Sequence, residues 1–241
     1  MNDFFKFKQF VIHQNNCAMK VCTDASLFGA WVANMFANKK LATPNKILDI
    51  GAGTGLLSLM LAQKITVPID AIEIDTQAFL QATYNVQGAT FYNEVKLFNS
   101  DILSHKSTEQ YDFIITNPPF YQQHLKATNL QQNMAMHDTT LSLEKLCLAI
   151  KNNLSAKGMV AILLPYQSMQ AAEILFKVNQ LYIQQLVQVK HAQAKNILRA
   201  MYLLAYSPCQ VYTTTTILIK NEANQYSNEF SYLLKDYYLY L

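Results

Sequence analysis

The sequence predicts an α/β fold in which a mostly parallel sheet of seven strands carries helices on both faces. Short apolar, β-branched runs alternate with helical patterns, and no repeat, low-complexity tract or linker divides the chain. A glycine-rich turn follows the first strand-like run, and polar residues follow several of the others. Because ligands of such sheets bind at the carboxyl ends of the strands, these polar residues are the first candidates for a site.

The expected elements follow one another in order. An apolar helix covers residues 27–36, with Thr23 or Asp24 as its candidate N-cap. Strands are expected at residues 47–50, 69–75, 95–99, 111–116, 159–165, 182–190 and 200–206. Further helices are expected at residues 56–62, at 76–87 with Thr76 as the cap, at 141–154 with an end near Gly158, and at 168–180.

The glycine turn follows the strand at residues 47–50 and contains Gly51, Gly53 and Gly55. Glycines allow the backbone to approach a ligand closely, and the helix that follows offers free N–H donors. Taken alone, the turn could equally be a dinucleotide site. Asp49, two residues before Gly51, would repel a pyrophosphate. It is compatible with a zwitterionic amino-acid cofactor that carries a sulfonium, so we count Asp49 among the cofactor-binding residues.

Two further acids follow strands of the predicted sheet. Glu73 lies 22 residues beyond Gly51 (73 − 51), where a βαβ unit presents an acid to ribose hydroxyls. NAD sites use the same acid, so Glu73 alone does not discriminate. Asp101, followed by Ile102, ends the third strand and could accept a hydrogen bond from an adenine amino group of the cofactor. The structural alternative is an aspartate that only caps a turn.

Asn117-Pro118-Pro119-Phe120 directly follows the strand at residues 111–116 and is the most informative stretch. A planar exocyclic amine is a poor nucleophile because its lone pair is delocalised. The Asn117 side-chain oxygen and the Pro118 carbonyl can each accept one N–H, which frees the lone pair for attack on an electrophilic methyl group. The prolines fix φ, and Phe120 offers a stacking face for a base. An ordinary strand-ending turn is the alternative.

Together, the glycine turn and the tetrapeptide predict methyl transfer from S-adenosylmethionine to an amino group. The cofactor-binding residues would be Lys20, Thr23, Asp24, Asp49, Gly51, Gly53, Gly55, Glu73, Asp101, Ile102 and Asn117. The catalytic residues would be Asn117, Pro118, Pro119 and Phe120. The turn at residues 20–24 would cover the methionine end of the cofactor, although capping of the helix alone would also explain it.

Two segments are candidates for substrate contact. Lys6 and Lys8 interleave with four phenylalanines at positions 4, 5, 7 and 10, which could stack bases and touch phosphates; a strand that buries the rings is the alternative. The Gln- and Asn-rich segment 121–138 follows the tetrapeptide, as a substrate lid would, or is a solvated connection. His137 at its far end is not assigned as a base, because the amine can lose its proton to water after methyl transfer.

Composition narrows the class of protein. Half of the 241 residues are hydrophobic (51%), but the longest apolar runs are too short for a bilayer, and no signal peptide is visible. The four cysteines show neither metal-ligand nor disulfide spacing, so we expect no metal and a cytoplasmic location. The net charge of +3 is weakly consistent with an RNA partner, and Arg199 is the sole arginine. We further expect a monomer.

The chain resembles the bacterial tRNA1(Val) adenine N6-methyltransferases, which modify adenine 37 beside the anticodon. The resemblance covers nearly the whole chain and is carried by residues 7–10, 17–21, 23–24, 27–31, the glycine turn, 117–120, 139–141, 203–208 and the aromatic C-terminus. Cys22 stands where the family usually has glycine, and Phe120 where relatives carry tyrosine. The resemblance implies a Rossmann-like class I methyltransferase and a tRNA substrate.

Within that family we expect three regions. Residues 1–45 form an N-terminal extension that acts as a cofactor lid and substrate contact, residues 46–208 form the methyltransferase domain, and residues 209–241 form a strand and helix tail packed on the same domain.

Four other activities stay open at this point. A guanine N2-methyltransferase of ribosomal RNA uses the same tetrapeptide. A glutamine N5-methyltransferase of a release factor acts on a similar planar amine, but those enzymes usually carry a longer N-terminal domain. DNA adenine methylation would need a recognition domain for which the chain leaves no room. A non-catalytic RNA-binding or assembly factor would not need the intact motifs.

Overall fold

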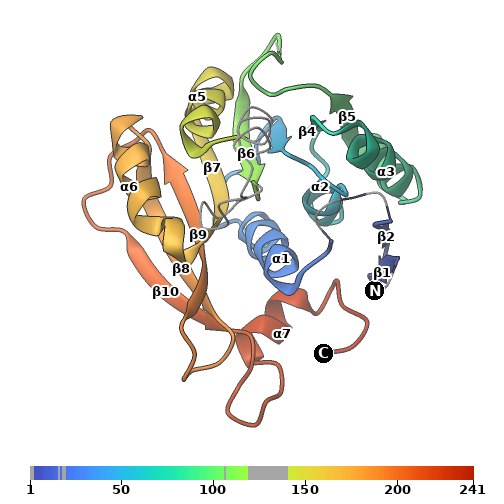
Figure 1. The fold of residues 1–241 in the computed structure, drawn as a ribbon, viewed down its shortest axis with the longest axis vertical. Helices are drawn as coiled ribbons and strands as arrows, with labels where there is room; N and C mark the ends of the chain where they lie inside the picture. The colour runs from blue at the N-terminus through green and yellow to red at the C-terminus, as the bar shows by residue number, and fades with distance from the viewer. Residues whose placement is uncertain (1–2, 16, 18–19, 106, 119–140) are drawn as a thin grey trace, which may run out of the picture.

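The computed structural model describes residues 3–15, 17, 20–105, 107–118 and 141–241. Within these residues the main sheet has eight strands in the order β10-β8-β9-β7-β6-β3-β4-β5 (Figure 1). Only β9 runs antiparallel to its neighbours. The strands are β3 (Ile47–Ile50), β4 (Ile69–Glu73), β5 (Val95–Asn99), β6 (Tyr111–Thr116), β7 (Leu154–Pro165), β8 (Tyr182–Lys190), β9 (Ile197–Ala205) and β10 (Thr213–Leu218). The α/β prediction is confirmed, with one strand more than expected.

Helices cover both faces of this sheet. One buried cluster joins it to α1 (Thr23–Ala37), α2 (Leu56–Ala62) and α7 (Asn228–Leu234). The other joins it to α5 (Leu143–Asn153) and α6 (Met169–Val178). α3 (Thr76–Gln87) packs along β4 and β5, and short 3-10 turns lie at Tyr92–Glu94 and Tyr166–Ser168. Because both faces are covered, neighbouring residues of a strand enter opposite clusters, as Phe113 and Ile114 do in β6, and the central strands are mostly apolar.

The eighth strand, β10, lies at one edge of the sheet and pairs in parallel with β8. It opens with four threonines, all of them exposed, and only Ile217 is buried. A search for apolar runs does not detect such a strand because edge strands face solvent.

The helix expected to end near Gly158 ends earlier. α5 stops at Asn153, and β7 begins at Leu154, so Gly158 lies inside a strand. A Cβ at Gly158 would lie 2.6 Å from Leu154 Cδ1 and 3.1 Å from the Asp112 carbonyl oxygen. The glycine therefore allows close packing and is not a helix stop.

Two capping predictions are also wrong. α3 is capped by Asp75 and not by Thr76: Asp75 Oδ1 accepts a hydrogen bond from Ala78 N at 2.8 Å. α1 begins at Thr23, and its N-cap is Cys22, which makes no side-chain capping bond.

A two-stranded hairpin, β1 (Phe4–Lys6) and β2 (Val11–His13), precedes α1. Asn85 of α3 holds it: Asn85 Oδ1 accepts from His13 N at 2.8 Å, and Asn85 Nδ2 donates to His13 O at 2.8 Å. The same Nδ2 donates to Thr54 O at 2.9 Å. One side chain, only 2% exposed, therefore joins the hairpin to the glycine turn.

Both ends of the chain meet near this hairpin (Figure 1), where Lys8 N donates to Tyr237 O at 2.8 Å. No helix within the described residues is long and apolar enough to cross a membrane.

Asn85→Ala should lower the free energy of unfolding by about 2–4 kcal/mol, because it leaves three buried backbone groups without their partner. Urea denaturation measures the change. The control is Gln87→Ala, an exposed position on the same helix, which should change stability by less than about 0.5 kcal/mol. Equal stability of the two variants would contradict the assigned role of Asn85.

Candidate active site

The glycine turn joins β3 to α2 at the carboxyl edge of the sheet. Gly51, Gly53 and Gly55 have φ values of 71°, 56° and 80°, a left-handed conformation that side chains with a Cβ rarely adopt. A Cβ at Gly51 or Gly53 would meet no atom within 4 Å, whereas one at Gly55 would touch Val86 and Ala82. The first two glycines therefore border open space that a ligand can enter, and the third packs against α3.

Glu73 ends β4 beside this turn and is 8% exposed. Its Oε2 accepts a hydrogen bond from Gly53 N at 2.8 Å, and its Oε1 accepts from Asp75 N at 2.9 Å. Asn99 Nδ2 donates to the Glu73 carbonyl at 2.9 Å. The carboxylate is thus fixed next to the open face of the glycine turn, as a group that binds ribose hydroxyls must be.

Asp49 lies under the turn and is fully buried. Ser58 Oγ of α2 donates to Asp49 Oδ2 at 2.7 Å, while Oδ1 has no partner among the described residues. Burial raises the pKa of Asp49 to about 7, and the nearby negative charge of Glu73 adds to the rise.

Asn117 and Pro118 follow β6, the neighbour of β3 on its other side. Thr116 is paired with Ile50 in the parallel register, and Thr116 Oγ1 donates to the Ile50 carbonyl at 2.9 Å. This bond ties the ends of the two strands together, so Asn117 lies next to Gly51. Asn117 is partly exposed and Pro118 is buried.

Asp101 follows β5 and closes a turn. Its Oδ1 accepts from Leu103 N at 2.9 Å, and its carbonyl accepts from His105 N at 2.9 Å. At least one carboxylate oxygen of Asp101 therefore stabilises a turn, which is the structural alternative to cofactor binding. Ile102 is buried in the cluster of α5 and α6.

Cys17, which sequence reasoning did not assign to the site, lies close to the acids. Burial raises the pKa of its thiol to about 11, and the charges of Glu73 and Asp75 add to the rise. No sequence pattern marks Cys17, because its environment is created by residues more than fifty positions away.

Asp24 forms an ion pair that the sequence did not suggest. Its Oδ2 accepts from Arg199 Nε of β9 at 2.6 Å, and its Oδ1 accepts from Ala25 N at 3.1 Å. Thr23 and Asp24 line a cavity of about 440 Å³ together with Arg199. Lys20 is partly buried before the start of α1.

Several predicted residues lie outside the described residues. They are Pro119, Phe120, the segment 121–138 and His137. The described part of the chain contains no group of three or more His, Cys, Asp or Glu residues placed to hold a metal ion.

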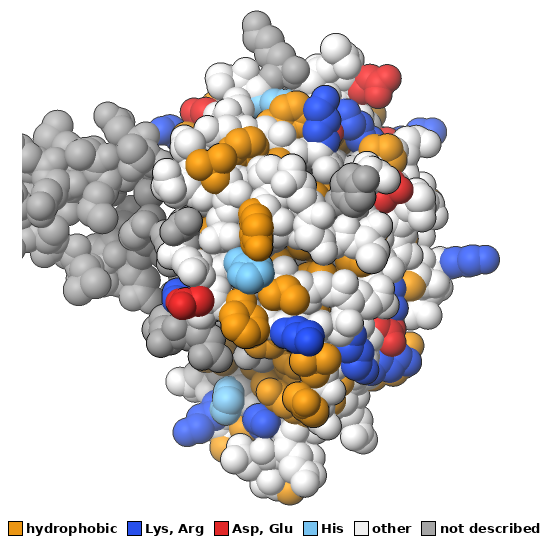
Figure 2. All heavy atoms as spheres, turned by 90° about the vertical axis from the view of Figure 1, so that its right-hand side faces the viewer, with side chains coloured by type: hydrophobic (Ala, Val, Ile, Leu, Met, Phe, Trp, Pro, Cys, Tyr) orange, Lys and Arg blue, Asp and Glu red, His pale blue; other side chains and the backbone are white. Residues whose placement is uncertain are grey.

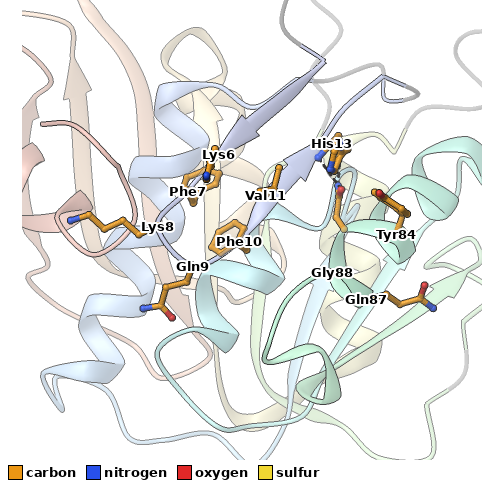
Figure 3. A pocket seen from close by; sticks show the side chains of 11 residues that line it. Lys6, Phe7, Lys8, Gln9, Phe10, Val11, His13, Tyr84, Gln87 and Gly88 are labelled. Carbon is orange, nitrogen blue, oxygen red and sulfur yellow. Dashed lines mark hydrogen bonds between the residues drawn. The ribbon is translucent and has the colours of Figure 1, made fainter.

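The phenylalanines near the N-terminus are divided between core and surface. Phe7 and Phe10 are buried and stacked at 4.6 Å, so the alternative of burial holds for these two rings, while Phe4 is 52% exposed. The hairpin and α3 enclose a cavity of about 580 Å³, to which Lys6 and Lys8 contribute from the hairpin and Tyr84 from α3 (Figure 3). Figure 2 shows the adjoining face, where hydrophobic side chains and lysines are exposed together.

Comparison with known proteins identifies the class. The family model described as the methyltransferase small domain matches residues 29–183. The fold is similar to a predicted O-methyltransferase from Agrobacterium tumefaciens, with a TM-score of 0.68 and 14% identity over 88% of this chain and 96% of that one. The glycopeptide N-methyltransferase MtfA, solved with S-adenosylmethionine, gives a TM-score of 0.54 with 10% identity over 74% of this chain and 94% of that one. The chain is therefore a member of the methyltransferase small domain family.

Curated relatives define the family more narrowly. A tRNA1(Val) (adenine(37)-N6)-methyltransferase from Parabacteroides distasonis is 32% identical over 99% of this chain and 98% of its own. One from a Shewanella species is 36% identical over 98% and 99%. One from Dyadobacter fermentans is 47% identical over 68% of this chain and 66% of its own. This chain belongs to the tRNA1(Val) (adenine(37)-N6)-methyltransferase family, as the resemblance predicts.

Asp49→Asn should change the pH dependence of stability. The folded pKa of about 7 lies above the usual value of 3.8, so the folded protein keeps this proton while the unfolded chain loses it. The contribution of Asp49 to stability is therefore full below about pH 4 and is lost as the pH rises to about 7. The free energy of unfolding of the variant minus that of the wild type should rise by roughly 2–4 kcal/mol over this range. Urea titrations at several pH values measure it, and a flat difference would refute the buried neutral carboxyl.

Proposed function

We propose that this protein transfers a methyl group from S-adenosylmethionine to the exocyclic N6 of an adenine in tRNA, namely adenine 37 of tRNA1(Val). The observation that carries the proposal is the position of Asn117 and Pro118. Two hydrogen-bond acceptors at the end of β6 are held next to the open face of the glycine turn by the bond from Thr116 to Ile50. The names of the full-length relatives supply the nucleotide and the RNA.

The chemistry follows from these acceptors. Asn117 Oδ1 accepts one N–H of the adenine amine and the Pro118 carbonyl accepts the other, so the nitrogen becomes tetrahedral and its lone pair is directed to the donor. The bound cofactor supplies an electrophilic methyl group on a sulfonium. The amine loses its proton to water after it has been methylated. Pro119 and Phe120 complete the proposed catalytic tetrapeptide, in which Phe120 would offer a stacking face for the adenine. Positioning of the two reactants supplies most of the rate.

In this proposal the cofactor binds at the carboxyl edge of the sheet, next to the acidic residues at the ends of β3, β4 and β5. Gly51, Gly53 and Gly55 shape its turn, Glu73 binds the ribose hydroxyls, and Asp49 Oδ1 faces the amino group. Asp101 and Ile102 border its adenine. The segment 20–24, with Lys20, Thr23 and Asp24, covers the methionine end, in agreement with the nearby Cys17.

The proposed organisation keeps residues 1–45 as a lid and substrate contact, 46–208 as the catalytic domain and 209–241 as a tail. We further propose that the protein is a monomer and that it lies in the cytoplasm. The four free cysteines favour a reducing compartment. The relatives give no support to the alternative substrates, which are ribosomal guanine and a release-factor glutamine. Membership of a methyltransferase family also argues against a non-catalytic assembly factor.

Asn117→Ala should lower the rate of methyl transfer at least about a hundredfold, because one of the two acceptors of the amine is lost. The Kd for S-adenosylmethionine, measured by calorimetry, should stay within a few-fold. Asn152→Ala, an exposed position in α5 at the opposite end of the sheet, is the matched control and should retain full activity. Full activity of Asn117→Ala would exclude the proposed mechanism.

Radiolabelled methyl groups should appear in tRNA when the protein is incubated with total tRNA, ribosomal RNA and protein. Nucleoside mass spectrometry should identify N6-methyladenosine. A tRNA1(Val) transcript in which adenine 37 is replaced by guanine is the matched control and should stay unlabelled. Label in ribosomal N2-methylguanosine or in protein glutamine would assign the enzyme to one of the alternative substrates.

A further inference from the structure

A cavity at the carboxyl edge lies next to the start of α1, on the side of β9, β8 and β10. Its volume is about 440 Å³, and Arg199, Lys220, His191 and Tyr226 line it beside Thr23 and Asp24, where α1 begins. We call it the basic pocket. Its residues come from three regions of the sequence, 23–24, 191–199 and 219–226, so sequence patterns do not reveal it.

Strand register places the basic pocket on the same edge as Asn117. Arg199 opens the antiparallel β9 and pairs with Pro165, the last residue of β7. His191 directly follows β8, and Lys220 lies two residues beyond the end of β10. Neighbouring strands are about 4.8 Å apart, so β9, β8 and β10 lie about 10, 14 and 19 Å from β6. The pocket is therefore one to a few nucleotides away from a base held at Asn117.

The surroundings of the pocket carry a local excess of positive charge. Between Glu173 and Glu222 the sequence contains no Asp or Glu, but it contains four lysines, Arg199 and His191. The protein as a whole has a net charge of only +3. Asp24 is the one acid that lines the cavity, and it is paired with Arg199. Within the described residues, neither Lys220 nor His191 forms an ion pair with a carboxylate.

The basic side chains are held in place before a ligand arrives. Asp24 accepts from Nε of Arg199 and the Leu198 carbonyl accepts from its Nη1 at 3.4 Å, which orients the guanidinium and leaves Nη2 for another acceptor. Lys220 Nζ lies 3.7 Å from the centre of the Tyr226 ring, and this ring stacks on Phe230 at 4.6 Å. An oriented guanidinium and a positioned ammonium form a site for a phosphate, the group that basic side chains bind most often in nucleic acids.

We propose that the basic pocket binds a backbone phosphate of the RNA strand that carries the methylated adenine, close to that nucleotide. This inference rests on the proposed function, since it takes the RNA as the substrate. Phosphate contacts fix the register of a nucleic acid on a protein without reading its sequence. Arg199 and Lys220 would therefore determine which base can reach Asn117, and they are binding and positioning residues.

Lys220→Gln and Arg199→Lys test the pocket in the full-length protein. Arg199→Lys keeps a cation next to Asp24 but removes the planar fork. Fluorescence anisotropy with a tRNA1(Val) transcript gives the Kd at several salt concentrations. Lys220→Gln should raise the Kd about tenfold near 0.1 M salt and reduce the slope of log Kd against log salt by about 0.7–0.9, the loss of one phosphate contact. Arg199→Lys should also raise the Kd, with a smaller change in slope because the positive charge remains. KM for the tRNA should rise in the same proportion.

Lys151→Gln is the matched control, because this exposed lysine lies in the last turn of α5, at the opposite end of the sheet. Its Kd and salt slope should equal those of the wild type. A wild-type salt slope in both pocket variants would overturn the inference while wild-type methylation of tRNA continues. An equal loss in Lys151→Gln, or an increased Kd for S-adenosylmethionine in place of tRNA, would overturn it as well. Failure of the proposed function is distinct: the wild type itself would then leave the tRNA unmethylated.

Discussion

The parallel register of β3 and β6, closed by the hydrogen bond from Thr116 Oγ1 to the Ile50 carbonyl, determines what this protein can do. It places a glycine turn that is open to a ligand next to Asn117 and Pro118, which we propose as the two acceptors for the amine. Neither group can adjust much, since Gly51 follows directly from β3 and Pro118 is a rigid residue buried at the end of β6. The distance between donor and acceptor is thus set by the spacing of two strands and not by flexible side chains.

The carboxyl edge of the sheet carries acidic groups at one end and basic groups at the other. On the side of β4 and β5 the groups are acidic: Asp49, Glu73, Asp75 and Asp101. On the side of β8, β9 and β10 they are basic: Lys190, His191, Arg199 and Lys220. The proposed reactants have the complementary charges, because the cofactor carries a sulfonium and an ammonium and RNA carries phosphates. Each reactant is therefore attracted to its own half, and Asn117 lies where the halves meet. The small net charge of the chain conceals this division.

The sequence predicted the strands and helices that contain apolar runs, and it predicted the glycine turn, where a positive φ is needed. β8 was expected with its observed bounds, 182–190, because apolar and β-branched residues recur along it despite three glutamines. Sequence reasoning expected a strand in the tail 209–241 but did not locate β10, whose threonines face solvent, and it took Gly158 for a helix stop when the glycine serves close packing. It also identified the residues at the ends of β3, β4 and β6, since strand ends are visible in the sequence. It could not find the pair of Asp24 and Arg199, because 175 residues separate the partners and only the finished sheet brings them together.

That pair links the two halves of the edge physically. Cys17 lies near Glu73 of β4, while Asp24, seven residues later (24 − 17), binds Arg199 of β9. In the strand order, β4 and β9 are four steps apart, which corresponds to about 19 Å. A single short stretch of chain therefore contributes to the walls of both the cofactor side and the basic pocket.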